Sequence, residues 1–176
     1  LASAAGQWAM TSHAPPRIFS RKRRIAGLRR ARVRQAHRDA ARYLLDDMVE
    51  DVLDRLEFIR LSPDRVLVIG DWTGTLALSL RGAGAEVDEH DAASLDEERP
   101  LDGGPYDLIV SNLPAQAGNE ALDEVLVDAW ERLSPGGSLV VVSVLGLRRF
   151  IRRRMEAIFG NYHKARQGPR HVVAQA

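Results

Sequence analysis

The 176-residue chain contains no cysteine and only five histidines. Without cysteine, disulfide bonds, thiolate zinc sites and a cysteine nucleophile are excluded. The histidines are scattered, so each is predicted to be a surface residue rather than a metal ligand. No apolar run approaches the roughly 20 residues that span a bilayer, so a transmembrane helix is excluded and membrane association is not indicated. A serine nucleophile elbow is also missing.

Acidic residues are scarce at both ends of the chain and basic residues are scarce in its middle, although the net charge is only +1. Residues 17–42 carry 11 Lys or Arg and one acid, residues 43–147 carry 6 against 22 acids, and residues 148–176 carry 8 and one acid. Such segregation is typical of flanking segments that bind a polyanion, with acidic proteins or anionic lipid as alternatives to RNA. The predicted nucleic-acid-binding residues are Arg21, Lys22, Arg23, Arg24, Arg29, Arg30, Arg149, Arg152 and Arg153.

The N-terminal third divides into two expected units. Residues 1–20, with small residues and Pro15-Pro16, are predicted to be a flexible arm. Residues 21–61 are predicted to be a basic and then acidic helical segment with a break near Ala36–Asp39, because apolar residues recur there at helical spacing. The arginine-rich stretch without acids has the composition of a mitochondrial transit segment or of a nucleic-acid-binding arm. We therefore expect the mitochondrial matrix, with the cytoplasm as the alternative.

Strand and helix patterns alternate through the third unit, residues 62–176. Short apolar runs predict strands at 65–70, 85–89, 106–112 and 138–144, the last after a turn at 134–137. Helices are predicted at 74–81, 119–133 and 147–159, and two short closing strands at 162–165 and 171–175. This alternation predicts an α/β protein with a mostly parallel sheet and an antiparallel C-terminal strand.

Several motifs then resemble the class I S-adenosylmethionine (SAM) methyltransferase family. Val66–Gly74 (VLVIGDWTG) resembles its glycine-rich first motif, and Leu133–Gly137 (LSPGG) resembles its turn into a later strand. Asp107–Ala115 (DLIVSNLPA) is similar to the fourth motif of small-domain enzymes that methylate ribosomal RNA guanines. Separately, residues 17–42 resemble a group that includes malonyl-carrier-protein methyltransferases and a respiratory complex I assembly factor. The resemblance implies a Rossmann-like class I methyltransferase sheet.

The resemblance also implies roles for individual residues. SAM would be bound through Gly70, Asp71, Gly74 and Asp91, and Asn112 and Pro114 would position a target amine. Glycines let the backbone turn sharply and approach a ligand closely, but Trp72 stands where the family has another glycine and Val68 where it has an acid. The alternatives are a plain strand-to-helix turn with Trp72 packed, a solvated acidic loop around Asp91 instead of a ribose or metal site, and an Asx-type turn at Asn112.

Only 14 residues, 92–105, separate Asp91 from the next predicted strand. A parallel crossover needs a dozen or more residues, so strand three of the family is predicted to be missing, together with the loop that reads adenine. We therefore expect a degenerate methyltransferase that acts as an RNA-binding or structural component of a larger assembly, ribonucleoprotein or mitochondrial. The alternative is an active SAM-dependent N-methyltransferase acting on RNA.

Overall fold

A computed structural model describes residues 26–27, 29–30, 33–34, 37, 43–71, 73–90, 103–113, 115 and 118–176. Its strands are β1 (Arg65–Ile69), β2 (Glu86–His90), β3 (Tyr106–Asn112), β4 (Leu133–Val144), β5 (His163–Gln167) and β6 (His171–Gln175). Its helices are α2 (Tyr43–Phe58), α3 (Thr75–Gly82), α4 (Asn119–Arg132), the 3-10 turn η2 (Leu145–Leu147) and α5 (Arg148–Phe159). None of the helices in this described part has the length and apolar character of a bilayer span.

The strands form one six-stranded sheet in the order β2-β1-β3-β4-β6-β5. β2, β1, β3 and β4 are parallel, and β6 runs antiparallel to both of its neighbours, as predicted for the C-terminal strand. Among the described residues, β2 forms the edge of the sheet next to β1. The predicted absence of strand three depends on residues 91–102, which lie outside the described residues. The α/β class and the Rossmann-like arrangement are confirmed.

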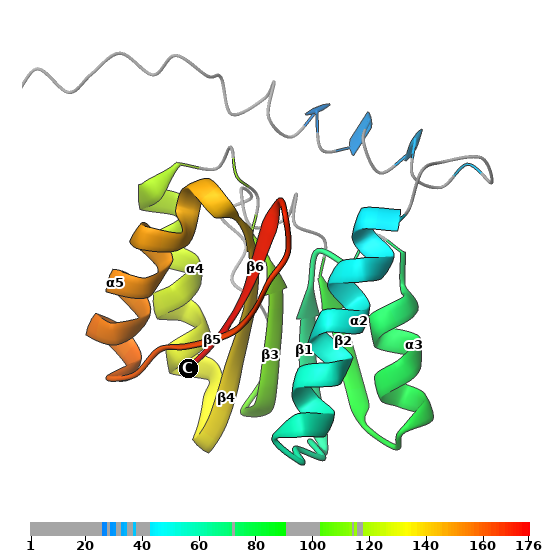
Figure 1. Ribbon diagram of the computed structural model, residues 1–176. Coiled ribbons are helices and arrows are strands. Elements are labelled where there is room, and N and C mark those ends of the chain that lie inside the picture. The colour runs from blue at the N-terminus through cyan, green and yellow to red at the C-terminus, as the bar shows by residue number, and fades with distance from the viewer. Residues whose placement is uncertain are drawn as a thin grey trace, which may run out of the picture.

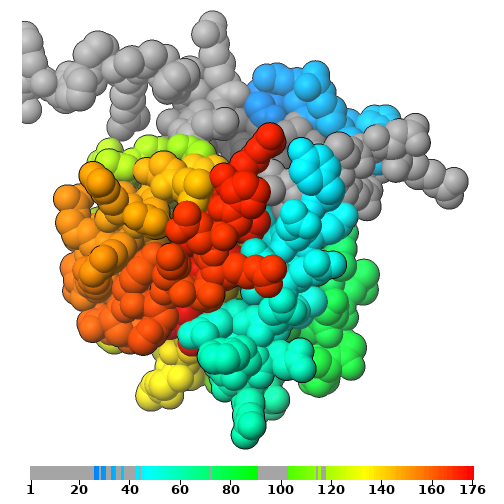
Figure 2. All heavy atoms as spheres, in the orientation of Figure 1, coloured from blue at the N-terminus to red at the C-terminus, as the bar shows by residue number. Residues whose placement is uncertain are grey.

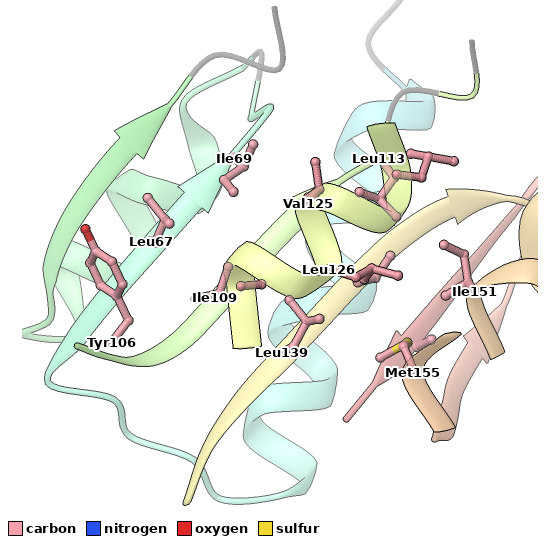
Figure 3. Packing of buried hydrophobic residues seen from close by; sticks show 14 residues of the cluster. Leu67, Ile69, Tyr106, Ile109, Leu113, Val125, Leu126, Leu139, Ile151 and Met155 are labelled. Atoms are coloured by element: carbon pink, nitrogen blue, oxygen red, sulfur yellow. The ribbon is translucent and has the colours of Figure 1, made fainter. Parts of the chain in front are cut away.

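Helices cover both faces of the sheet, with α2 and α3 on one side and α4 and α5 on the other (Figure 1). Successive side chains of a strand point to opposite faces, so each strand supplies both cores. Figure 3 shows Leu126 of α4 beside Leu139 of the sheet, with Ile151 and Met155 of α5 on the same face. The α2 and α3 face contains the alternate strand residues, such as Val66, together with Val52, Leu56, Leu76 and Leu80. Burial on both faces explains the nearly continuous apolar runs of β1, β3 and β4.

The start of β4 differs from the prediction of a turn at 134–137 followed by a strand from Ser138. β4 begins at Leu133, which pairs with Tyr106, and the register then shifts so that Leu108 pairs with Ser138. Gly137 permits this bulge because a Cβ there would lie 2.9 Å from the Tyr106 carbonyl oxygen. β5 is also two residues longer at its end than predicted. The flexible arm 1–20 and most of the predicted helix break lie outside the described residues.

Candidate functional site

A cavity of about 30 Å³ lies at the carboxyl ends of the parallel strands, beneath α2. Gly70 and Asp71, which follow β1, and Asn112, which ends β3, line it together with Val142 of β4. Ligands of open α/β sheets bind at this edge, so three predicted site residues converge where the fold predicts a site. The roof is apolar and consists of α2 residues Leu45, Met48, Val49 and Val52.

The turn from β1 to α3 depends on two glycines. Gly70 has a φ of 78° and Gly74 a φ of 71°, a region that other residues rarely adopt. A side chain at position 74 would meet open space, so the backbone conformation, not crowding, requires glycine there. The predicted sharp strand-to-helix turn is therefore confirmed, although Gly74 itself does not line the cavity.

Asp71 is bound to the start of α3 by both of its carboxylate oxygens. Oδ1 accepts hydrogen bonds from the Thr73 N–H (3.2 Å), the Thr73 hydroxyl (2.9 Å) and the Gly74 N–H (3.1 Å). Oδ2 accepts from the N–H groups of Leu76 (2.9 Å) and Ala77 (3.2 Å). The first N–H groups of a helix attract anions, and here a side chain of the same chain satisfies them.

Asn112 is half-buried and lines the cavity. No side chain or backbone group of the described residues hydrogen-bonds its amide, so the Asx-type turn offered as an alternative is not formed with any of them. The next residue, Leu113, is buried and its N–H donates to the Val142 carbonyl (2.9 Å), which extends the strand pairing beyond Asn112. Pro114, Asp91 and Trp72 lie outside the described residues.

A family model, the methyltransferase small domain, matches residues 65–175. The chain belongs to this family. The match begins with β1 and ends with β6, so it covers the whole sheet and leaves α2 outside.

Solved structures of methyltransferases share the fold. The DhpI–SAH complex aligns with a TM-score of 0.60 at 15% identity over 86% of this chain and 95% of that one. The 16S rRNA methyltransferase RsmC of T. thermophilus, solved with AdoMet and guanosine, aligns with a TM-score of 0.56 at 23% identity over 80% of this chain. The ribosomal protein L11 methylase of Lactobacillus delbrueckii subsp. bulgaricus gives 0.55 at 19% over 72% of this chain and 76% of its own. This methyltransferase small domain protein spans 43% of the RsmC chain. A search of curated protein sequences found no match to the present chain.

Three features of the described residues bear on SAM binding by this methyltransferase small domain. The cavity under α2 is smaller than the roughly 300–1,000 Å³ of pockets that enclose ligands of such size, and residues 72 and 91–102 of the predicted site lie outside the described part of the chain. Val68, at the position where the family has an acid, is 1% exposed and packs in the same core cluster as Val52 of α2. Asp71 adds a negative charge where α3 would otherwise offer free N–H donors to a ligand carboxylate.

The predicted nucleic-acid-binding residues are only partly described. Arg29, Arg30, Arg149 and Arg153 are exposed, and no described residue pairs with Arg149 or Arg153. Arg152 donates to Glu156 (2.9 Å), which raises the pKa of the guanidinium further. Arg21, Lys22, Arg23 and Arg24 lie outside the described residues. The patch on α5 thus keeps two unpaired guanidinium groups one helical turn apart.

One polar cluster was not predicted from the sequence, and it corrects the expectation that every histidine is a surface residue. His171 is 2% exposed, and its Nε2 lies 2.8 Å from Asp51 Oδ2 of α2. Arg166 of β5 binds the other Asp51 oxygen at 2.8 Å. These contacts fasten α2 to the β5–β6 hairpin, beside which it lies in Figure 2. The sequence spacing gave one indication of this contact. His171 lies on the same face of β6 as Val173, and Asp51 lies next to Val52 on the buried side of α2, so both fall beside the same core cluster.

Proposed function

We propose that this protein is a methyltransferase-fold pseudoenzyme, which binds RNA as a component of a larger assembly and has lost the use of SAM. The observation that carries the proposal is the Asp71 carboxylate, which occupies the N-terminal donors of α3 with both oxygens. A residue placed in this way stabilises the helix start and competes with the carboxylate of a ligand such as SAM for these N–H donors.

The cavity beneath α2 supports the loss of SAM. The roof formed by Met48, Val49 and Val52 packs onto the carboxyl edge and leaves about 30 Å³. The buried Asp51–His171 contact joins this helix to β6. Opening the cavity to ligand size would therefore expose part of the α2 core.

The arginines support RNA as the partner. Arg149 and Arg153 are exposed and unpaired within the described part of the chain, and Arg152 lies next to them on α5. A guanidinium forms two parallel hydrogen bonds to a phosphate, and a surface with mixed charges would instead pair its arginines with acids. RsmC, which shares the fold, acts on 16S rRNA and was solved with guanosine. A ribonucleoprotein particle is the setting we favour, and a mitochondrial complex is the second prediction.

Thermal unfolding with and without saturating SAM or its demethylated product tests the loss of the cofactor. A ligand at 100 times its Kd adds about 2.7 kcal/mol, which corresponds to a Tm increase of roughly 5–10 °C for a chain of this size. We expect no increase with either ligand. An increase of that size would overturn the proposed loss of SAM binding.

RNA binding is tested separately by the anisotropy of labelled single-stranded RNA at several salt concentrations. We expect tighter binding at low salt, and the double variant Arg152→Glu with Arg153→Glu should abolish binding. Binding by the variant equal to that of the parent would exclude this patch. Absence of binding by the parent would overturn RNA as the partner.

A second candidate function is methyl transfer to an RNA amine. Asn112 favours it, because its half-buried amide faces the same cavity as Gly70 and has no partner among the described residues. The amide oxygen there could accept a hydrogen bond from a target amine and orient it. Transfer of label from SAM to RNA, lost in Asn112→Ala, would establish this function in place of the first. Failure to transfer label to any cellular RNA fraction would exclude it.

A further inference from the structure

A second hollow lies at the rim of the sheet, where β4 turns into α5. It measures about 230 Å³ and is lined by Leu145, Gly146, Arg148, Arg149 and Gln167. The Leu145 N–H donates to the Arg170 carbonyl (3.2 Å), which ties the β4 end to the turn between β5 and β6. Figure 1 shows this turn and the start of α5 at the same edge of the molecule. The hollow is therefore formed between the β4–α5 junction and the β5–β6 hairpin, which this hydrogen bond joins.

The charge around this hollow has one sign. The Gln167 Oε1 accepts from Arg148 Nη1 at 3.1 Å and from Lys164 Nζ at 3.5 Å, so a neutral oxygen holds two cations. Arg149 brings a third cation, and no described residue pairs with it. None of the residues lining the hollow is acidic. Cations gathered in this way repel one another unless an anion lies between them.

We propose that this hollow binds a phosphate group, which RNA presents when it binds the protein. Two arginines on one wall match the planar, bidentate geometry by which guanidinium groups bind phosphate. Gln167 holds Arg148 in place, which reduces the side-chain entropy lost when an anion binds. RNA as the source of the phosphate rests on the proposed function, whereas the anion site itself rests only on these contacts.

The position of the hollow suits a bound RNA strand. Val142 lines the cavity beneath α2 and Leu145 lines the hollow, three residues further along the same chain, or on the order of 10 Å. The described residues of the basic N-terminal segment, 26–27, 29–30 and 33–34, lie at the same end of the molecule in Figure 2. An RNA strand with a phosphate in the hollow would thus pass over the carboxyl ends of the parallel strands, between the basic N-terminal segment and the start of α5.

The test compares Arg149→Gln with Arg60→Gln. Both variants lose one exposed positive charge, but Arg60 lies between α2 and β1, at the amino ends of the parallel strands, whereas Arg149 lies beyond their carboxyl ends. For labelled single-stranded RNA, Arg149→Gln should weaken binding roughly tenfold, about the effect of one charge-assisted hydrogen bond, and reduce the slope of log K against log salt by about 0.7. Arg60→Gln should change neither quantity. Equal effects of the two substitutions on a parent that binds RNA would overturn the hollow as the phosphate site and leave RNA binding standing.

Inorganic phosphate separates the two proposals. In the intact protein, titration with phosphate should shift the NMR signals of the Gly146 amide and the Arg149 side chain, and the shift at Gly146 should vanish in Arg149→Gln. This result without RNA binding would support the phosphate site and overturn RNA as its source. A parent that binds RNA but shows no phosphate shift, and no difference between the two variants, would overturn the hollow alone. Absence of both responses would overturn both proposals.

Discussion

Replacing Asp71 with alanine should destabilise the protein by about 2 kcal/mol. The substitution removes five hydrogen bonds, two of them to N–H groups in the first turn of α3. Loss of a side-chain cap costs about 1 kcal/mol, and loss of a negative charge at a helix N-terminus costs about 0.3–1 kcal/mol. The partly buried position raises the cost toward the upper end, because the N–H groups of Leu76 and Ala77 begin a helix in which Leu76, Ala77 and Leu80 are buried.

The assay is thermal unfolding followed by circular dichroism. About 2 kcal/mol lowers the Tm of a 176-residue chain by roughly 4–8 °C. Asp71→Asn keeps one acceptor oxygen, so only one of the two groups of donors loses its partner, and it should cost about 1 kcal/mol. Glu131→Gln, which removes an exposed carboxylate of α4, is the matched control and should stay within about 2 °C of the parent.

The same variants test whether Asp71 stands in for a ligand carboxylate. Asp71→Ala frees N–H donors at the start of α3, so SAM or its product should raise the Tm of this variant more than that of the parent. An Asp71→Ala protein as stable as the parent would refute the capping argument. A parent stabilised by SAM as much as the variant would refute the competition argument, whatever the cost of the cap.

Three further predictions concern contacts away from this turn. His171→Gln should lower the free energy of unfolding in urea by about 2 kcal/mol, because Asp51 stays buried with a poorer partner; a loss below about 0.5 kcal/mol would contradict this. Burial raises the pKa of Tyr106 to about 12 from 10.0, so the protein should lose stability as the pH rises from 10 to 12, and Tyr106→Phe should lack this loss; parallel urea midpoints for parent and variant would contradict the assignment. Arg154→Gln breaks a partly exposed double hydrogen bond between Arg154 of α5 and Asp123 of α4. It should lower the free energy of unfolding in urea by about 1 kcal/mol. An unchanged urea midpoint would mean that packing alone joins the two helices.

The sheet could be predicted from the sequence because local signals coincide with its elements. β3 and β6 begin and end at the residues that the apolar runs predicted, 106–112 and 171–175, since each run is bounded by turn residues and buried on both faces. The start of β4 could not be predicted in this way. Pairing of Leu133 with Tyr106 depends on a bulge and on the space left by Gly137, and these are contacts between distant segments.

The candidate site was predictable in place but not in detail. Gly70, Asp71 and Asn112 meet at the carboxyl edge because parallel strands end there, which follows from topology. The capping bonds of Asp71 depend on backbone angles that the sequence does not state, and the resemblance implied a cofactor-binding role instead. Asp51 and His171 are separated by 120 residues and carry no local pattern that joins them.

The two openings at the rim of the sheet differ in a way that bears on the ligand of this protein. The cavity beneath α2 is small and apolar, and Asp71 places a carboxylate at its wall. The hollow at the β4–α5 junction is several times larger, and its charged side chains are Arg148 and Arg149. Asp71 disfavours an anion at the first opening, and the two arginines favour an anion at the second, because charges at the rim repel or attract an approaching phosphate or carboxylate. A phosphate is therefore expected beside Arg149 rather than in the cavity beneath α2, and comparison of the Asp71 and Arg149 variants measures this difference between the two openings.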